Sequence, residues 1–266
     1  MFITRIFLTL LIFPASCLFS AQTKNFPKNK FNSANLSSKP LVVIDPGHGG
    51  GDLGAKIRNP YIEEKRLALT TAIYLKRDLL RMGYRVVLTR YIDQYITLPI
   101  RAKIANRKKA ALFISLHFNS CKNNSAKGIE IFYNRNEKNK KRSALSKGLA
   151  SCILQDSVKQ TKMDSRGVKS AGFVVIKETK MPSVLVEGGF LTNFSDRQKL
   201  RKREFLLKLA KGIAIGSDKF LKSKMKTKTI RLARAKKVAK KRVSRKIARV
   251  IKKKVSVGTT WIFEKI

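Results

Sequence analysis

Short apolar runs alternate with longer amphipathic segments through the middle of the chain, and this alternation constrains the fold more than any other feature. The runs are rich in Val, Ile and Leu, which is typical of strands buried in a sheet. We predict strands at residues 41–44, 85–90, 112–116, 129–133, 173–176 and 184–186. Apolar residues at helical spacing predict helices at about 64–82, 100–105, 144–154 and 205–220. Strands that alternate with helices predict an α/β fold: a single domain with a mostly parallel or mixed central sheet flanked by helices.

The first residues of the chain indicate export. Met1 to Arg5 ends in a positive charge, and residues 6–13 form an apolar run shorter than the ~20 residues that cross a bilayer. We therefore predict a signal peptide at residues 1–21, and an uncleaved N-terminal anchor is the alternative. Pro-Ala-Ser before Cys17 loosely resembles a lipoprotein box, so Cys17 is a candidate for lipidation. We expect the protein in the periplasm or elsewhere in the cell envelope, with membrane association as an option.

Composition divides the rest of the chain into three parts. Residues 22–40 are polar, rich in Lys, Asn and Ser, and predict a flexible linker. The predicted strands and helices lie within residues 41–220, where we expect the folded domain. Residues 221–266 form a Lys/Arg-rich C-terminal extension.

The charge of the chain is strongly positive. It carries 59 Lys and Arg residues against 16 Asp and Glu residues, a net charge of +43. Such a charge repels itself unless the basic groups are solvated or bind an anionic partner. We expect the extension to bind anionic lipid headgroups or an anionic envelope polymer, and a disordered solubilising extension is the alternative. The export signal argues against nucleic acid as the partner.

Cys121 and Cys152 remain if Cys17 belongs to the signal peptide. They are able to pair in an oxidising envelope, but two cysteines without metal-type spacing carry little weight. A disulfide and two unpaired thiols are therefore both open.

The chain contains two histidines, His48 and His117, and each is placed at the end of a predicted strand. The carboxyl ends of strands in open α/β sheets are the usual place for a site. Two imidazoles and one carboxylate are a familiar ligand set for catalytic zinc, and Glu63 and Glu64 are the nearest candidates outside the His48 loop. Packed or surface histidines, and a glutamate that offsets a helix dipole, are the structural alternatives.

Glu187 directly follows the apolar run 184–186 and precedes Gly188 and Gly189. A charged group after a buried strand costs free energy unless it is paired or lies in a solvated cleft. Glu187 is thus a candidate general base that accepts a proton from water, with the two glycines letting backbone approach a substrate. A cap of the next turn is the structural alternative.

Four motifs in order along the chain point to a known family. They are Asp45-Pro46-Gly47-His48-Gly49-Gly50, Glu64-Lys65 at a helix start, Ser115-Leu116-His117-Phe118-Asn119, and Val186-Glu187-Gly188-Gly189-Phe190. Shorter matches lie between them, at 98–106, 127–130 and 166–169. Each motif alone is weakly specific, but the ordered set covers residues 41 to about 220. The chain resembles the zinc-dependent N-acetylmuramoyl-L-alanine amidases, the family of the bacterial cell-separation amidases.

The resemblance implies that residues 41–220 form a zinc amidase catalytic domain with a mixed sheet. It implies Zn²⁺ as cofactor, held by His48, Glu64 and His117, with Glu187 as the catalytic carboxylate. Glu64 matches the Glu-Lys of the family, and Glu63 is the fallback. The implied reaction is hydrolysis of the amide between N-acetylmuramic acid and L-alanine in peptidoglycan or muramyl peptides, for cell-wall remodelling or cell separation.

The chain departs from the family in two respects. Leu53 stands where Pro is usual, and we expect no N-terminal wall-targeting domain of the kind common in relatives. Some relatives carry an added helix that plugs the zinc site until a partner removes it. The segment from His117 to Glu187 is short, so we expect an unplugged enzyme, with an activator protein still a candidate partner.

Two other functions fit the same residues. A zinc peptidase acting within the peptidoglycan stem peptide would use the same ligand set. A non-catalytic protein that binds peptidoglycan or an envelope polyanion would depend mainly on the basic extension.

Overall fold

The structure is a computed structural model that describes residues 39–225 together with residues 227, 229, 242 and 245. The predicted signal peptide, most of the predicted linker and most of the basic extension lie outside the described residues. In the part of the chain that is described, no helix has both the length and the apolar character that a membrane crossing requires.

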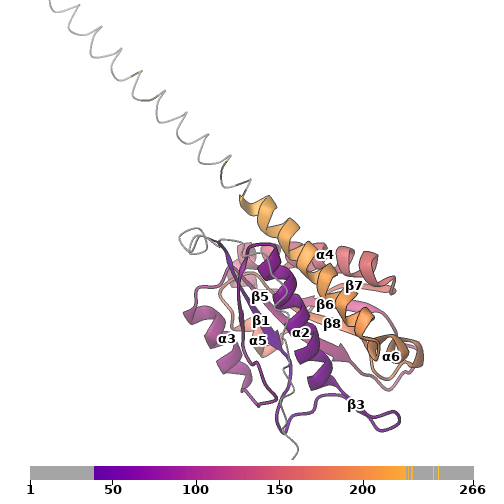
Figure 1. The fold of residues 1–266 in the computed structure, drawn as a ribbon. Helices are drawn as coiled ribbons and strands as arrows, with labels where there is room; N and C mark the ends of the chain where they lie inside the picture. Colours follow the sequence, from indigo (N-terminus) through magenta and orange to yellow (C-terminus); the bar gives the residue numbers. More distant parts are fainter. Residues whose placement is uncertain (1–38, 226, 228, 230–241, 243–244, 246–266) are drawn as a thin grey trace, which may run out of the picture.

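A six-stranded sheet forms the centre of the domain (Figure 1). Its strands are β1 (Leu41–Pro46), β4 (Arg85–Leu88), β5 (Leu112–Asn119), β6 (Ile129–Tyr133), β7 (Ser165–Ser170) and β8 (Ser183–Phe190). They are arranged in the order β4-β1-β5-β8-β6-β7. The first four strands run parallel, β6 is antiparallel to β8, and β7 is parallel to β6. The sheet is therefore mixed, which confirms the predicted α/β class.

Helices cover both faces of this sheet (Figure 1). They are α2 (Glu64–Arg81), α3 (Leu98–Arg107), α4 (Lys140–Thr161), α5 (Val174–Lys177), α6 (Phe194–Leu200) and a helix over residues 203–225. A short hairpin of β2 (Lys56–Ile57) and β3 (Ile62–Glu63) precedes α2, and a 3-10 turn, η1 (Glu137–Asn139), precedes α4. Apolar residues of α2, α4 and the helix over 203–225 pack on one face, and those of α3 and α5 pack on the other.

The alternation of side chains along the strands separates a structural face from a functional face. Val42 and Ile44 of β1 lie in the core beneath α2 and α4, whereas Leu41 and Val43 lie beneath α3 and α5. Each such fully buried side chain contributes about 1.5–3 kcal/mol to folding. Because successive residues of a strand point to opposite faces, Asp45 follows Val43 onto the second face. Polar groups at the carboxyl ends of β1, β5 and β8 gather there.

The predicted strand at residues 173–176 is wrong, because Val174–Lys177 is helix α5. The sequence Phe-Val-Val-Ile has the composition of a buried strand, but strand preference mainly reflects how side chains pack. In the fold, Val175 and Ile176 are buried against the second face of the sheet, and one helical turn achieves this burial. Phe173 keeps an extended backbone as the residue before the helix.

Several elements have no counterpart among the predictions, and β7 and α6 are the longest of them. Strand β7, with the sequence SRGVKS, lacks apolar alternation and lies at the edge of the sheet, where it pairs only with β6. Helix α6 has only two apolar residues, Phe194 and Leu200, which lie six positions apart. The side chain of Asn193 caps it by accepting a hydrogen bond from the backbone N–H of Asp196. The predicted helix at 144–154 lies inside the longer α4, whose first turn is polar.

Cys121 and Cys152 are unpaired thiols in the structure. Both are half-buried, and the Cys121 thiol contacts the backbone oxygen of Asn123 at 3.0 Å. The pairing that the sequence left open is therefore not made.

Candidate metal centre

Two imidazoles and one carboxylate converge at the carboxyl ends of β1 and β5. Nε2 of His48 lies 3.0 Å from Oε1 of Glu64, and Nδ1 of His117 lies 2.8 Å from the same oxygen. One ligand atom from each of the three residues lies within 4.8 Å of the others. The structure thus brings the three predicted ligands together in an arrangement that is able to hold a metal ion.

Glu64, rather than Glu63, belongs to this cluster. Glu64 is the first residue of α2 and is buried, and its two oxygens accept hydrogen bonds from the backbone N–H groups of Ala55 (2.8 Å) and Phe118 (3.1 Å). Glu63 points elsewhere, since its carboxylate accepts a hydrogen bond from Nε of Arg66 at 2.7 Å. The fallback ligand is therefore not placed at the centre.

The charges of the cluster stabilise one another. Burial acts to raise the pKa of Glu64, but hydrogen bonds and charge interactions with His117 and His48 outweigh it and hold the pKa well below its ordinary value. Burial acts to lower the pKa of His48, whereas Glu64 and Asp52 raise it, and the net shift is upward. The centre therefore favours a positive charge, and protons and a metal ion compete for it.

The loop after β1 has little freedom around His48. His48 has a left-handed backbone with φ 57°. A Cβ atom on Gly47 would lie 2.3 Å from Cε1 of His117, and one on Gly54 would lie 2.6 Å from Oε2 of Glu64. Gly54 also has a positive φ of 66°, a backbone conformation that residues other than glycine rarely adopt. The metal centre is thus packed directly against backbone.

Asp52 orients the imidazole of His48. Its Oδ2 lies 2.8 Å from Nδ1 of His48, and its Oδ1 accepts a hydrogen bond from the backbone N–H of Gly54 at 3.1 Å. Burial acts to raise the pKa of Asp52, but these hydrogen bonds lower it below the ordinary value. A carboxylate on the far ring nitrogen fixes the tautomer and leaves Nε2 to face the centre.

Asp45 is fully buried at the end of β1 and is compensated by three donors. Its carboxylate accepts hydrogen bonds from Nη1 of Arg101 (3.0 Å), Oγ1 of Thr89 (2.6 Å) and Oγ of Ser115 (2.8 Å). Removing one partner of a buried ion pair typically costs about 3–5 kcal/mol. Asp45 therefore ties α3 and strands β4 and β5 to the loop that carries the first histidine.

Two buried arginines hold the backbone of that loop. Arg101 donates to the carbonyl oxygens of Pro46 (2.7 Å) and His48 (2.8 Å). Arg90 donates to the carbonyl oxygens of Gly47 (2.7 Å) and Pro46 (3.1 Å). These bonds pre-organise the His48 loop without using its side chains.

Glu187 lies beside the metal centre on β8. It pairs in register with His117 of β5 and, on its other side, with Glu130 of β6. Its Oε2 is buried and has no hydrogen-bond partner among the described residues. Burial, followed by the charges of Glu64 and Glu130, raises the pKa of Glu187 well above its ordinary value. A carboxyl group in this setting is suited to proton transfer near neutral pH.

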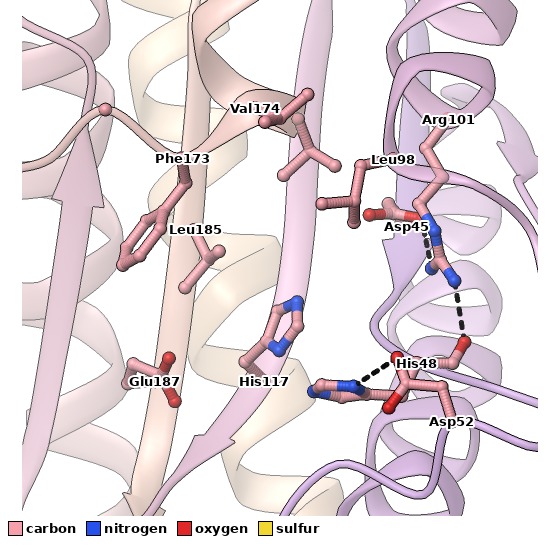
Figure 2. Close-up of a pocket in the computed structure, with 12 residues that line it drawn as sticks. Asp45, His48, Asp52, Leu98, Arg101, His117, Phe173, Val174, Leu185 and Glu187 are labelled. Carbon is pink, nitrogen blue, oxygen red and sulfur yellow. Dashed lines mark hydrogen bonds and ion pairs between the residues drawn. The ribbon is translucent and has the colours of Figure 1, made fainter.

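A cavity of about 460 Å³ opens over these groups (Figure 2). Figure 2 shows His48, His117 and Glu187 along one side of it, facing a group of apolar side chains. The apolar side comprises Leu98, Phe173, Val174 and Leu185. A largely apolar concave site with a few convergent polar groups is typical of a substrate-binding pocket.

Glu130 organises a second cluster next to Glu187. The buried carboxylate accepts hydrogen bonds from Nδ2 of Asn119 (2.7 Å), Nε of Arg166 (2.8 Å) and Nζ of Lys169 (2.5 Å). Burial acts to raise the pKa of Glu130, but Lys169 and Arg166 hold it below its ordinary value. Asn119, the last residue of β5, therefore links β5 to β6.

Sequence reasoning missed the residues that support the ligands. Asp45 and Asp52 lie in or beside the His48 motif, and a charged residue that ends an apolar run was an available signal for Asp45. The pairing of Asp45 with Arg101 joins residues 56 positions apart, and no local pattern indicates it. The same holds for Glu130 with Arg166, which are 36 positions apart.

Comparison with known proteins identifies the family. A family model described as N-acetylmuramoyl-L-alanine amidase matches residues 42–219. The N-acetylmuramoyl-L-alanine amidase LytC of Bacillus subtilis (strain 168) is 38% identical over 197 residues, which are 73% of this chain and 38% of LytC. The chain therefore spans less than half the length of this relative.

Solved structures agree with the sequence match. An N-acetylmuramoyl-L-alanine amidase from Clostridium difficile 630 is 37% identical, with a TM-score of 0.66 over 70% of this chain and 98% of that chain. The CwlD amidase from Clostridioides difficile, solved in complex with the GerS lipoprotein, is 28% identical, with a TM-score of 0.64 over 70% of this chain and 100% of that chain. These matches confirm the resemblance that the ordered motifs suggested. The chain belongs to the N-acetylmuramoyl-L-alanine amidase family.

Proposed function

We propose that this chain is a zinc-dependent enzyme that hydrolyses the amide bond between N-acetylmuramic acid and L-alanine in peptidoglycan. The observation that carries the proposal is the convergence of His48, Glu64 and His117 beside Glu187 at one cavity. Family membership supports the substrate, and the donor set supports the metal. We expect the reaction to contribute to cell-wall remodelling or cell separation.

The donor set fits zinc. Two imidazole nitrogens and one carboxylate oxygen form a ligand set typical of catalytic zinc, which leaves one position open. Magnesium and calcium prefer oxygen ligands alone, so two histidines favour a transition metal or zinc. The contact of Asp52 with Nδ1 of His48 is the supporting interaction that such a histidine usually has. Zinc held there would polarise the amide carbonyl and acidify the attacking water.

Glu187 performs the proton transfers in the proposed reaction. Its unpaired Oε2 accepts the proton of the attacking water and then delivers it to the departing nitrogen of L-alanine. The raised pKa of Glu187 makes both transfers accessible near neutral pH. The apolar side of the cavity, including Phe173 and Leu185, orients the substrate and excludes other water.

Product analysis tests the proposal. The full chain, loaded with zinc, is incubated with purified peptidoglycan or a muramyl peptide, with and without a chelator, and the products are identified by mass. We expect intact stem peptide with a free amine on L-alanine, and its loss on chelation and in His117→Ala. Glu187→Gln should retain metal but lose about 10²–10⁴-fold in rate. Glu137→Gln, an exposed glutamate in η1, is the matched control and should retain full activity.

Other products would indicate the rival functions. A cut within the stem peptide, with the same dependence on metal, would identify a zinc peptidase. Binding of peptidoglycan without any cleavage, unaffected by Glu187→Ala, would identify a non-catalytic binder and would refute the proposed reaction.

We further propose that the enzyme acts in the periplasm or elsewhere in the cell envelope. The signal-peptide pattern at residues 1–21 supports export, and the charge of residues 221–266 supports contact with anionic lipid or an envelope polymer. Cell fractionation with an antibody to the chain tests the location. Recovery in the cytosol would contradict it.

We propose that no plug has to leave the site before substrate enters. Helix α4 packs against the sheet face opposite the cavity, and the side chains of His48 and His117 remain 22% and 16% exposed. The structure of CwlD with the GerS lipoprotein supports a partner protein as a modulator. The purified chain is expected to cleave muramyl peptides alone, and strict dependence on an added protein would contradict this.

A further inference from the structure

Arg166 of β7 is fixed by two neighbours but leaves the end of its guanidinium group unused. Nε donates to Oε2 of Glu130 at 2.8 Å, and the group lies 4.9 Å from the centre of the Phe190 ring. In the described part of the chain, neither Nη nitrogen of Arg166 has a hydrogen-bond partner, and the side chain is 33% exposed. An oriented pair of N–H donors therefore faces outward.

Lys169 adds a second positive charge at the same carboxylate. Its Nζ also contacts Oε2 of Glu130, and its side chain is 40% exposed. One cation suffices to neutralise the single charge of Glu130. The group of Glu130, Arg166 and Lys169, here named the β7 cationic cluster, therefore keeps an excess positive charge, and its Glu130 is the register partner of Glu187.

The separation between the β7 cationic cluster and the proposed reaction centre follows from the order of the strands. Glu130 of β6 faces Glu187 of β8, and β7 is the next strand outward. Adjacent strands are about 4.8 Å apart, so the backbone of β7 lies about 10 Å from that of β8. Arg166 spans part of this distance because its side chain reaches Glu130. Two extended peptide residues cover about 7 Å, so a group on the residue after L-alanine falls within reach.

We propose that Arg166 and Lys169 form a subsite for a carboxylate carried by the stem-peptide residue that follows L-alanine. The inference rests on the proposed amidase function. The free Nη donors of Arg166 suit the two oxygens of a carboxylate, and charge-assisted bonds of this kind are about twice as strong as neutral ones. A carboxamide at the same position offers no compensating charge. The chain therefore prefers stem peptides whose second residue has a free α-carboxylate over the amidated form.

A matched pair of substrates tests the subsite. The full zinc-loaded chain is given two muramyl peptides that differ only in whether the α-carboxyl group of the second peptide residue is free or amidated. We expect kcat/KM to be about tenfold or more higher for the free carboxylate. Arg166→Gln is expected to remove most of this preference, mainly through KM, so that the ratio of the two rates falls toward one. Lys169→Gln should act in the same direction with a smaller effect.

Arg135 provides the matched control. Its Nε also donates to a glutamate, Glu137 at 2.8 Å, but both side chains are exposed, and Glu137 belongs to η1 rather than to the strand that pairs with Glu187. Arg135→Gln should change neither rate. Equal rates of the wild type on both substrates would overturn the subsite. Equal losses of kcat/KM on both substrates in Arg166→Gln would show that Arg166 only positions Glu130 and does not bind the substrate carboxylate.

Equilibrium binding separates this inference from the amidase proposal. The dissociation constants of both muramyl peptides are measured by calorimetry with Glu187→Gln, which should bind without cleaving. A tenfold preference for the free carboxylate supports the subsite even if no bond is cut by the wild type. Cleavage without any preference in rate or affinity supports the amidase and refutes the subsite, and binding of neither peptide refutes it as well.

Discussion

At His48, a left-handed backbone turns the imidazole toward Glu64, and contacts with Asp52 and Arg101 keep it there. Asp52 holds Nδ1, Arg101 holds the carbonyl oxygen, and Gly47 leaves room for the ring of His117. None of these contacts involves the atom that faces the centre. The ligand is therefore positioned before a metal binds, which lowers the free energy needed to organise the site.

Removing the carboxylate of Asp52 should weaken metal binding. Asp52→Ala takes away the partner of Nδ1 of His48, and such supporting contacts are worth about 10–100-fold in metal affinity. Competition with a chromophoric chelator measures the change. Asp52→Asn keeps one oxygen for Nδ1 of His48 but loses the acceptor for the Gly54 N–H, so it should lose less affinity than Asp52→Ala. An unchanged affinity in Asp52→Ala would show that the contact does not support the ligand.

A methyl group at Gly47 should disturb the centre directly. In Gly47→Ala the new Cβ would lie 2.3 Å from the His117 ring, so the ring or the loop has to move. Overpacking of this kind costs about 1–3 kcal/mol, and we expect lower zinc affinity and a lower Tm. Gly51→Ala is the control in the same loop, because a Cβ there meets nothing within 4 Å. Equal behaviour of the two variants would contradict the close packing.

Among the elements, strands β5, β6 and β7 are joined on the functional face by one carboxylate. Glu130 of β6 accepts hydrogen bonds from Asn119 of β5 and from Arg166 and Lys169 of β7. Strand β7 lies at the edge of the sheet and carries few apolar residues, so these polar contacts help to hold it in place. The same contacts lie next to Glu187 and set the charge around it.

Glu130 should contribute stability that depends on pH. Its pKa in the folded chain is below the unfolded value of about 4.3, so its contribution is present above that pH and is lost as the pH falls through the folded pKa. Glu130→Gln is expected to lower the free energy of unfolding by about 3 kcal/mol at pH 7, with the difference from wild type shrinking in acid. Urea unfolding at a series of pH values measures it.

Glu137→Gln provides the comparison for this pH series. Glu137 belongs to an exposed ion pair with Arg135, and such pairs contribute about 0–1 kcal/mol. A difference between Glu130→Gln and wild type that stays constant down to strongly acidic pH would show that the charge of Glu130 is not responsible.

At the scale of the whole molecule, one face of the sheet carries most of the apolar core and the other carries the candidate site. The face under α2, α4 and the helix over 203–225 carries the larger apolar core, whereas the face under α3 and α5 carries the metal centre and its cavity. The helix over 203–225 packs on the structural face, and the remainder of the basic extension follows it in the sequence. Catalysis and charge-driven attachment are therefore expected to be separable.

Truncation after residue 225 should separate these two properties. It removes sixteen Lys and Arg residues, each worth about 1 kcal/mol near an anionic membrane surface. Binding to anionic lipid vesicles in a sedimentation assay should fall by tenfold or more, while kcat/KM on a soluble muramyl peptide stays within about twofold. Added salt should weaken only the full chain's binding, and neutral vesicles should bind neither form. Vesicle binding that survives truncation would place the attachment elsewhere.

Sequence patterns alone predict the α/β class, most of the strands, the family and the residues that meet at the metal centre. These features are local, because apolar periodicity marks buried elements and short motifs carry the ligands. The order of the motifs along the chain predicted that His48, Glu64, His117 and Glu187 lie at one site. Family knowledge chose Glu64 over Glu63, and the structure places Glu64 in the cluster because Glu63 is bonded to Arg66 instead.

Contacts between distant parts of the folded chain determine how those groups are supported and where the weakly patterned elements lie. The pairing of Asp45 with Arg101, the cluster around Glu130 and the edge strand β7 all join residues far apart in sequence. Residues 173–176 have strand composition but form α5, because a helical turn buries Val175 and Ile176 against the sheet. Long-range burial and charge compensation leave no local periodicity, so they become visible only once the chain has folded.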